Sequence, residues 1–178
     1  MLRIIIKYGS VSGLIVILTM ILGHVLSSSE GFFAGAVFGY LVMLVALSMI
    51  FLGVKTYRDR ELGGVIRFWP ALAVGAGIAA VAGVAYVVAW EAYLVMTDYA
   101  FASEYTAGLI EEKRAAGLSE EALAAEVERL RAFEQQYLNP LFRIPVTFTE
   151  IFPVGLIIAL ISAGVLRNPE VLPAQQPA

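Results

Sequence analysis

The stretch FFAGAVFGYLVMLVALSMIFLGV, residues 32–54, contains no charged side chain. An α-helix rises about 1.5 Å per residue and the hydrocarbon core of a bilayer is roughly 30 Å thick, so about 20 apolar residues cross it. The stretch therefore predicts a membrane-spanning helix. It decides the fold class because comparable apolar runs precede and follow it.

These other runs cover residues 4–26, 68–97 and 148–167. The whole chain is 60% hydrophobic and 15% charged, with a mean hydropathy of +0.81. Soluble domains are nearer about half apolar and about a quarter charged. The first run superficially resembles a signal peptide, but its apolar stretch has the length of a span, so we expect it to be retained. The sequence predicts an all-α integral membrane protein, a bundle of four transmembrane helices.

Basic residues predict the orientation of these spans. Lys and Arg lie at the N-terminus, in the connection 55–67 and directly after the fourth run, whereas the connection 27–31 has none. The positive-inside rule then places both termini and residues 55–67 in the cytoplasm. The long connection 98–143 is expected on the opposite side, and residues 168–178 are expected to form a flexible C-terminal tail.

The connection 98–143 is expected to fold as an extracytoplasmic helical hairpin, its first arm a possible extension of the third span. Gly117 is a suitable left-handed stop after one helix, and Ser119 can cap the next. An apolar stripe follows at spacings of three or four residues: Leu123, Val127, Leu130, Phe133 and Tyr137. The favoured interpretation is a solvated cap folding on itself and on the bundle. A partner-binding or oligomerising face on residues 98–138 is the alternative, whereas an acidic polar side disfavours membrane-surface binding.

Small residues recur four apart in every span. They are Gly9 and Gly13; Gly31, Gly35 and Gly39; Gly75, Ala79 and Gly83; and Gly155, Ala159 and Ala163. Such tracks allow helices to approach closely in lipid. Packing within one four-helix bundle is the favoured interpretation, and a homodimer through the second or third helix is the alternative.

Three ionisable residues, His24, Glu91 and Glu150, lie within or at the ends of the spans. Helix phase places His24 and Glu91 beside the small-residue tracks. They can form an outward-facing polar pocket that exchanges a proton or holds a cation. The favoured interpretation is that they are boundary residues that reach headgroups or pair with the hairpin, because they lie at the ends of the spans and not at the midplane. For Glu150 a capping box beginning at Thr147 is the favoured interpretation.

Other chemistry is disfavoured by what the chain contains. It has no cysteine and one histidine, so zinc–thiolate and iron–sulfur sites built from its own thiolates are excluded, and a catalytic zinc site is not expected. No phosphate-binding or dinucleotide fingerprint is present. The net charge of −3 does not favour nucleic acid. We expect no cofactor, no metal and no enzymatic activity.

The segment KTYRDRELGG, residues 55–64, is expected to anchor the cytoplasmic side or to dock a partner or lipid headgroup. The residues assigned to this role are Lys55, Tyr57, Arg58, Asp59, Arg60, Gly63, Gly64 and Arg67. Asp59 and Glu61 can pair locally with neighbouring cations, at little energetic value if exposed. Gly63 and Gly64 supply a turn back into the bilayer.

The same segment carries a family resemblance. Leu52 to Asp59, followed by Gly63-Gly64-Val65-Ile66-Arg67-Phe68, resembles the pattern of a bacterial membrane family catalogued as domain of unknown function 4199. Gly117-Leu118-Ser119-Glu120-Glu121 resembles a Glu-rich segment of that family, and the likeness covers nearly the whole chain. The resemblance implies the inner membrane of a diderm bacterium. It implies no activity, substrate or cofactor.

Together these observations predict a multi-pass membrane protein that acts as a non-enzymatic scaffold or accessory subunit. Its partners are expected to be membrane lipids and either another protein or a second copy, through the small-residue faces or the hairpin. The alternative is a small transporter or ion-coupled protein that uses the polar pocket around His24 and Glu91.

Overall fold

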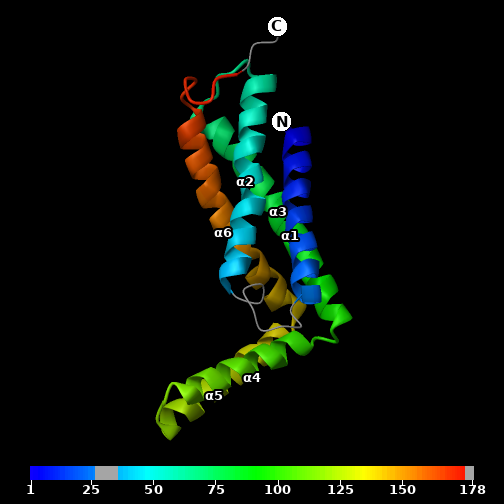
Figure 1. The fold of residues 1–178 in the computed structure, drawn as a ribbon, viewed down its shortest axis with the longest axis vertical. Coiled ribbons are helices and arrows are strands. Elements are labelled where there is room, and N and C mark those ends of the chain that lie inside the picture. Colours follow the sequence, from blue (N-terminus) through cyan, green and yellow to red (C-terminus); the bar gives the residue numbers. More distant parts are fainter. Residues whose placement is uncertain (27–35, 175–178) are drawn as a thin grey trace. The chain divides into compact units, whose positions relative to one another are not determined.

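The structure is a computed structural model, and it describes residues 1–26 and 36–174; the side chains of residues 20, 22–26 and 36–40 lie outside this description. Throughout the described residues the regular structure is helical (Figure 1). The helices are α1 (Leu2–Leu26), α2 (Ala36–Glu61), α3 (Phe68–Met96), α4 (Ala100–Ala115), α5 (Glu120–Tyr137) and α6 (Pro140–Leu166). Four of them, α1, α2, α3 and α6, are long and apolar enough to cross a membrane. The all-α class and the four apolar helices are therefore confirmed.

The chain divides into two compact units. Unit 1 comprises Met1–Tyr86 and Phe148–Ala178, and unit 2 comprises Val87–Thr147. Helices α3 and α6 contribute residues to both units. Each unit has its own apolar cluster, so each is described separately below.

The core of unit 1 lies among its four apolar helices. Helices α1 and α2 pack along each other, and the Ser12 hydroxyl on α1 donates a 2.8 Å hydrogen bond to the Ala46 carbonyl on α2. Fully buried aliphatic side chains fill the space between the helices: Leu47, Ile50, Val54, Val74, Ile78 and Leu166. A buried hydroxyl that reaches a helix carbonyl is satisfied locally, so it does not interrupt this core.

Helices α3 and α6 approach each other through small residues in a reciprocal arrangement. A Cβ built on Gly75 would lie 2.7 Å from the Cβ of Ala159, and one built on Gly155 would lie 2.8 Å from the Cβ of Ala79. Each glycine thus faces the alanine of the other helix. Both distances are too short for a real side chain, so the two backbones are held at a separation that only glycine permits.

Helix α1 meets α3 in a similar way. Gly9 faces Val81, and Gly13 faces Ala85. Gly83 faces the ring of Phe148 instead, with 2.7 Å between a built Cβ and Cε2. Gly31, Gly35 and the surroundings of Gly39 lie outside the described residues. The described small residues therefore serve contacts within unit 1.

Helix α2 extends further than the apolar run that predicts it. The helix continues through the charged residues to Glu61, and Lys55 pairs with Asp59 one turn later. Such a pair four residues apart supports the added turns. The chain then turns at Gly63 and Gly64, whose φ values are 65° and 93°. These left-handed conformations favour glycine, as the paired glycines predict.

Unit 2 contains two consecutive helices, α4 and α5, that pack against each other. Gly117 between them has a φ of 74°, and the Ser119 side chain accepts a 3.3 Å hydrogen bond from the Ala122 backbone N–H. Both features are as predicted. Helix α4 is not an extension of α3, because Asp98 and Tyr99 adopt left-handed conformations with φ of 49° and 59°.

Helix α6 starts earlier than the apolar pattern indicates. Pro140 occupies its first position, where a missing N–H costs nothing, and the side-chain oxygen of Asn139 accepts a 3.0 Å hydrogen bond from the Leu141 N–H. Thr147 and Glu150 therefore lie in the interior of the helix. The capping-box interpretation of Glu150 is wrong for this reason, since no free helix N-terminus exists there.

The contact between α3 and α6 can be tested with two glycines of the same helix. We expect Gly155→Ala to lower the free energy of unfolding by about 1–3 kcal/mol, because the added methyl group meets Ala79. Gly164→Ala is the matched control, since a Cβ there has no neighbour within 4 Å, and it should be neutral or slightly stabilising. Unfolding of the purified protein in detergent measures both. Equal effects of the two substitutions would contradict the close approach.

Candidate functional site

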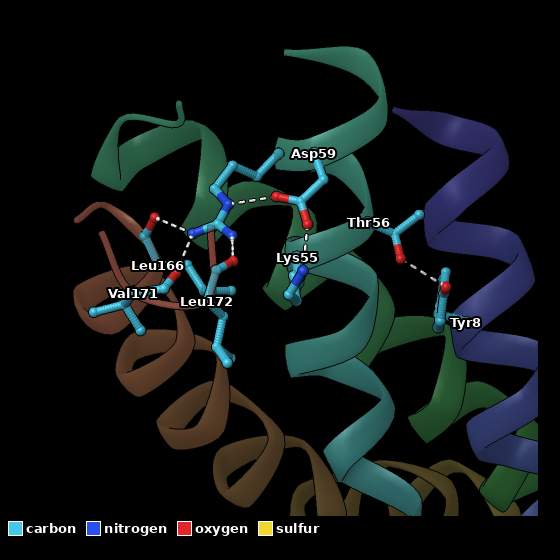
Figure 2. Close-up of polar contacts among 8 residues, drawn as sticks. Tyr8, Lys55, Thr56, Asp59, Leu166, Val171 and Leu172 are labelled. Atoms are coloured by element: carbon cyan, nitrogen blue, oxygen red, sulfur yellow. Dashed lines mark hydrogen bonds and ion pairs between the residues drawn. The ribbon is translucent and has the colours of Figure 1, made fainter. Parts of the chain in front are cut away.

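Among the described residues of unit 1, the most fully buried charge is Arg58, in the last two turns of α2. Its side chain is 0% exposed. Its Nε donates to Asp59 Oδ1 at 2.7 Å, and Nη1 donates to the carbonyls of Val171 at 2.9 Å and Leu166 at 3.4 Å (Figure 2). Nη2 donates to the carbonyl of Leu172. One side chain of α2 therefore binds three carbonyl groups at and beyond the end of α6.

Those carbonyls explain why an arginine stands here. Leu166 is the last residue of α6, and the final carbonyls of a helix have no partner within the helix. A cation at a helix C-terminus also interacts favourably with the helix dipole. The planar guanidinium offers five donors in a fixed geometry, which a lysine cannot do. Arg58 thus caps α6 and connects it to α2.

Asp59 completes the cluster by bridging two cations. One of its oxygens accepts from Arg58 Nε, and the other accepts from Lys55 Nζ. The side chain of Asp59 is 16% exposed, and that of Lys55 is 29% exposed. A buried guanidinium without a counter-ion would cost several kcal/mol. We call Lys55, Arg58 and Asp59 the Arg58 cluster.

Two further contacts hold the N-terminal helix at the same end of unit 1. The hydroxyls of Tyr8 and Thr56 lie 2.7 Å apart (Figure 2). The N-terminal amine of Met1 forms a 2.6 Å ion pair with Glu61. The Arg58 cluster therefore lies within a set of polar contacts that joins α1, α2 and the segment after α6.

The remaining residues assigned to the docking loop behave differently. Tyr57 is half-buried and packs on the core, while Gly63 and Gly64 form the turn described above. Arg60 and Arg67 are exposed. The segment thus contains two groups of residues, one committed to internal contacts and one directed outward.

Unit 2 contains a second buried arginine, Arg143 in the first turn of α6, which is 2% exposed. It binds Glu91 of α3 with two hydrogen bonds, Nε to Oε1 at 2.7 Å and Nη2 to Oε2 at 2.6 Å. Its Nη1 donates to the carbonyls of Tyr137 at 2.9 Å and Leu138 at 3.1 Å, at the end of α5. Arg143 therefore caps α5 and connects it to α3. Arg58 caps α6 and connects it to α2 in the same way.

Aromatic rings enclose this pair, which we call the Arg143 cluster. The guanidinium carbon lies 5.2 Å from the ring centroid of Tyr99 and 5.9 Å from that of Tyr137. The Trp90 N–H donates to the Tyr137 hydroxyl at 2.7 Å. The Trp90 ring also meets the edge of Phe101, with centroids 4.7 Å apart. Cation–π contacts and ring packing add to the ion pair and keep it partly desolvated.

The three residues of the predicted polar pocket have separate surroundings. The side chain of His24 lies outside the described residues. Glu91 is engaged by Arg143 through both oxygens. Glu150 is exposed, and it accepts a 3.2 Å hydrogen bond from the Tyr86 hydroxyl within unit 1. The described residues thus supply a partner to each of the two acids, and the two partners differ.

The ion pairs on α4 and α5 join residues of a single helix at the protein surface. On α5, Arg129 donates to Glu126 at 2.6 Å, and this hydrogen bond holds the pKa of the Glu126 carboxyl below its ordinary value. Exposed pairs three residues apart contribute little to stability. Among the described residues, no group of three His, Asp or Glu side chains is placed to hold a metal ion.

The sequence places Arg143 in the connection 98–143 and Arg58 in the predicted anchor segment, and the patterns used above do not indicate that either is buried. A signal for Arg143 does exist. It is the only basic residue between Arg131 and Arg167, and it stands just before the fourth apolar run, where the single acid of the third run needs a counter-ion. No comparable pattern marks Arg58, because the carbonyls it binds are backbone groups.

A family model described as protein of unknown function (DUF4199) matches residues 7–168. The chain belongs to this family. The match confirms the resemblance carried by KTYRDRELGG and the Glu-rich segment. Searches of curated proteins and of solved structures returned no match.

The role of Arg58 can be tested against its neighbour Arg60. We expect Arg58→Gln to lower the free energy of unfolding by about 3–5 kcal/mol, because the loss leaves buried carbonyls without their donor and Asp59 with Lys55 as its one cation. Arg60→Gln removes the same charge from an exposed site and should change stability by less than about 0.5 kcal/mol. Unfolding in detergent measures both variants. A similar small effect at both positions would show that Arg58 is not a structural cap.

Proposed function

We propose that this chain is a non-enzymatic multi-pass membrane protein that serves as a scaffold or accessory subunit of a membrane complex. The observation that carries the proposal is the use of the buried charges. Arg58 and Arg143 both cap helix ends, and each is paired with a carboxylate. Charges used this way stabilise a fixed arrangement of helices within each unit.

The state of Glu91 favours this role over ion coupling. Both carboxylate oxygens accept hydrogen bonds from Arg143, so protonating Glu91 would break a bidentate pair and leave a buried guanidinium without its counter-ion. The reciprocal Gly–Ala contacts of α3 and α6 point the same way, because they close the space between those two helices.

A surface for a partner is available on unit 2. Part of the apolar stripe of α5 faces α4, but Phe133 remains 43% exposed, and Tyr105 on α4 is 53% exposed. Large exposed rings on a helix pair that is mostly polar are typical of protein contact sites. This surface supports the accessory role, with another protein or a second copy as the partner.

Helix lengths support a placement in the membrane. At about 1.5 Å per residue, the 29 residues of α3 and the 27 residues of α6 would be about 44 and 41 Å long, whereas a hydrocarbon core is about 30 Å thick. Both helices are therefore expected to project beyond the core. With the basic ends inside, the projecting ends carry Glu91 and Arg143, and α4 and α5 lie outside the cytoplasm. The bacterial inner membrane is the proposed location.

Orientation can be tested because the chain contains no native cysteine. In intact cells, a membrane-impermeant maleimide should label Ser119→Cys, and it should label Arg60→Cys only after the cells are opened. Both positions are exposed, so access to the side chain is matched. If Arg60→Cys is labelled in intact cells and Ser119→Cys is not, the proposed orientation is contradicted and the opposite orientation is supported.

The partner surface can be tested by isolation of the full chain in mild detergent. We expect a stoichiometric partner or a defined oligomer, and we expect Tyr105→Ser/Phe133→Ser to lose it, since truncating central aromatic residues weakens such contacts by tenfold or more. Arg114→Ser/Arg131→Ser alters two exposed polar positions of the same helices and should retain it.

Circular dichroism checks that each variant keeps its helical content. Recovery of the unsubstituted chain as a monomer without a partner would contradict the accessory role. Unchanged assembly of Tyr105→Ser/Phe133→Ser would leave that role standing but place its contact elsewhere.

A further inference from the structure

The Arg58 cluster divides the basic residues at one end of unit 1 into two classes. Lys55 and Arg58 are bound to Asp59, and the N-terminal amine is bound to Glu61. Five other basic side chains near this end are exposed: Arg3, Lys7, Arg60, Arg67 and Arg167. Among the described residues, no carboxylate forms an ion pair with any of the five.

Contacts within unit 1 bring these five residues to the same end. Met1 pairs with Glu61, which places Arg3 near Arg60. Arg58 binds the carbonyl of Leu166, the residue before Arg167. A Cβ built on Gly64 would lie 3.2 Å from the Cβ of Ala174, so the turn that precedes Arg67 contacts the segment after α6. Figure 1 shows the start of α1 and the ends of α2 and α6 at the same end of unit 1.

Exposed apolar side chains border these cations. Leu62 and Val65 in the turn are 40% and 60% exposed, and Trp69 at the start of α3 is 73% exposed. Tryptophan favours the boundary between hydrocarbon and headgroups. Lys7 lies one turn inside α1, and its ammonium group is 5.6 Å from the centroid of the Tyr8 ring. A lysine side chain is long enough to reach the headgroup boundary from this position. Exposed cations and exposed apolar side chains therefore occur together at this end of unit 1.

We propose that Arg3, Lys7, Arg60, Arg67 and Arg167 form a binding surface for the headgroups of anionic glycerophospholipids. Four to eight basic residues directly beside a transmembrane helix suffice to recruit anionic lipid, each strengthening binding by about fivefold. The bordering apolar residues favour lipid over a soluble anion, because they place the phosphate-binding groups at the depth of the headgroups. This surface is separate from the partner surface on unit 2, so either can fail without the other.

Trp69 provides a direct reporter. The chain has two tryptophans, and Trp90→Phe leaves Trp69 alone. The full-length Trp90→Phe protein is titrated in detergent micelles with brominated phosphatidylglycerol or with brominated phosphatidylcholine, each of which quenches tryptophan on contact. We expect phosphatidylglycerol to reach half-maximal quenching at a mole fraction at least about fivefold lower than phosphatidylcholine does. The difference should shrink as salt is added.

Two double variants in the same background complete the test. Arg60→Gln/Arg67→Gln should remove most of the preference, whereas Lys113→Gln/Arg131→Gln, which removes two charges from α4 and α5, should keep it. Thermal unfolding confirms that the variants fold. Equal quenching by the two lipids would overturn the proposal. A preference that persists in Arg60→Gln/Arg67→Gln would also overturn it.

Discussion

A guanidinium group that leaves water needs a partner for its charge and for its donors, and this constraint organises one end of unit 1. Arg58 meets it with Asp59 and with three carbonyl groups, that of Leu166 at the end of α6 and those of Val171 and Leu172 beyond it. The bond to Leu166 satisfies a carbonyl that the helix itself cannot satisfy, and the other two hold the segment that follows α6. Removing either side would leave the other buried and unpaired, so α2 and the end of α6 depend on each other.

The same solution occurs in unit 2 with different residues. Arg143 pairs with Glu91 and caps the end of α5. In both cases an arginine near a helix end binds one carboxylate and carbonyl groups at or just beyond the end of another helix. These contacts give Arg58, Arg143 and their carboxylate partners Asp59 and Glu91 a structural role. They also leave two exposed cations available for other contacts, Arg60 in the KTYRDRELGG segment and Arg67 just after it.

Much of the fold could be predicted because it depends on local chemistry. Apolar runs of span length predict α1, α2, α3 and α6, and the conformations of Gly117 and Ser119 follow from turn and capping rules. Prediction was weaker at helix boundaries. Charged residues extended α2 to Glu61, and Pro140 started α6 well before its apolar run, because helix formation tolerates polar residues that hydropathy excludes.

The sequence by itself determined the class of the protein, its family and the positions of its apolar helices, since hydropathy, glycine conformation and a charged motif are properties of short segments. Only the tertiary structure decided which charges are buried and what they bind. Arg58 and Arg60 are two residues apart and chemically identical, yet one is enclosed and the other is exposed. The difference arises from helix phase and from backbone carbonyls more than 100 residues away, which no local pattern records.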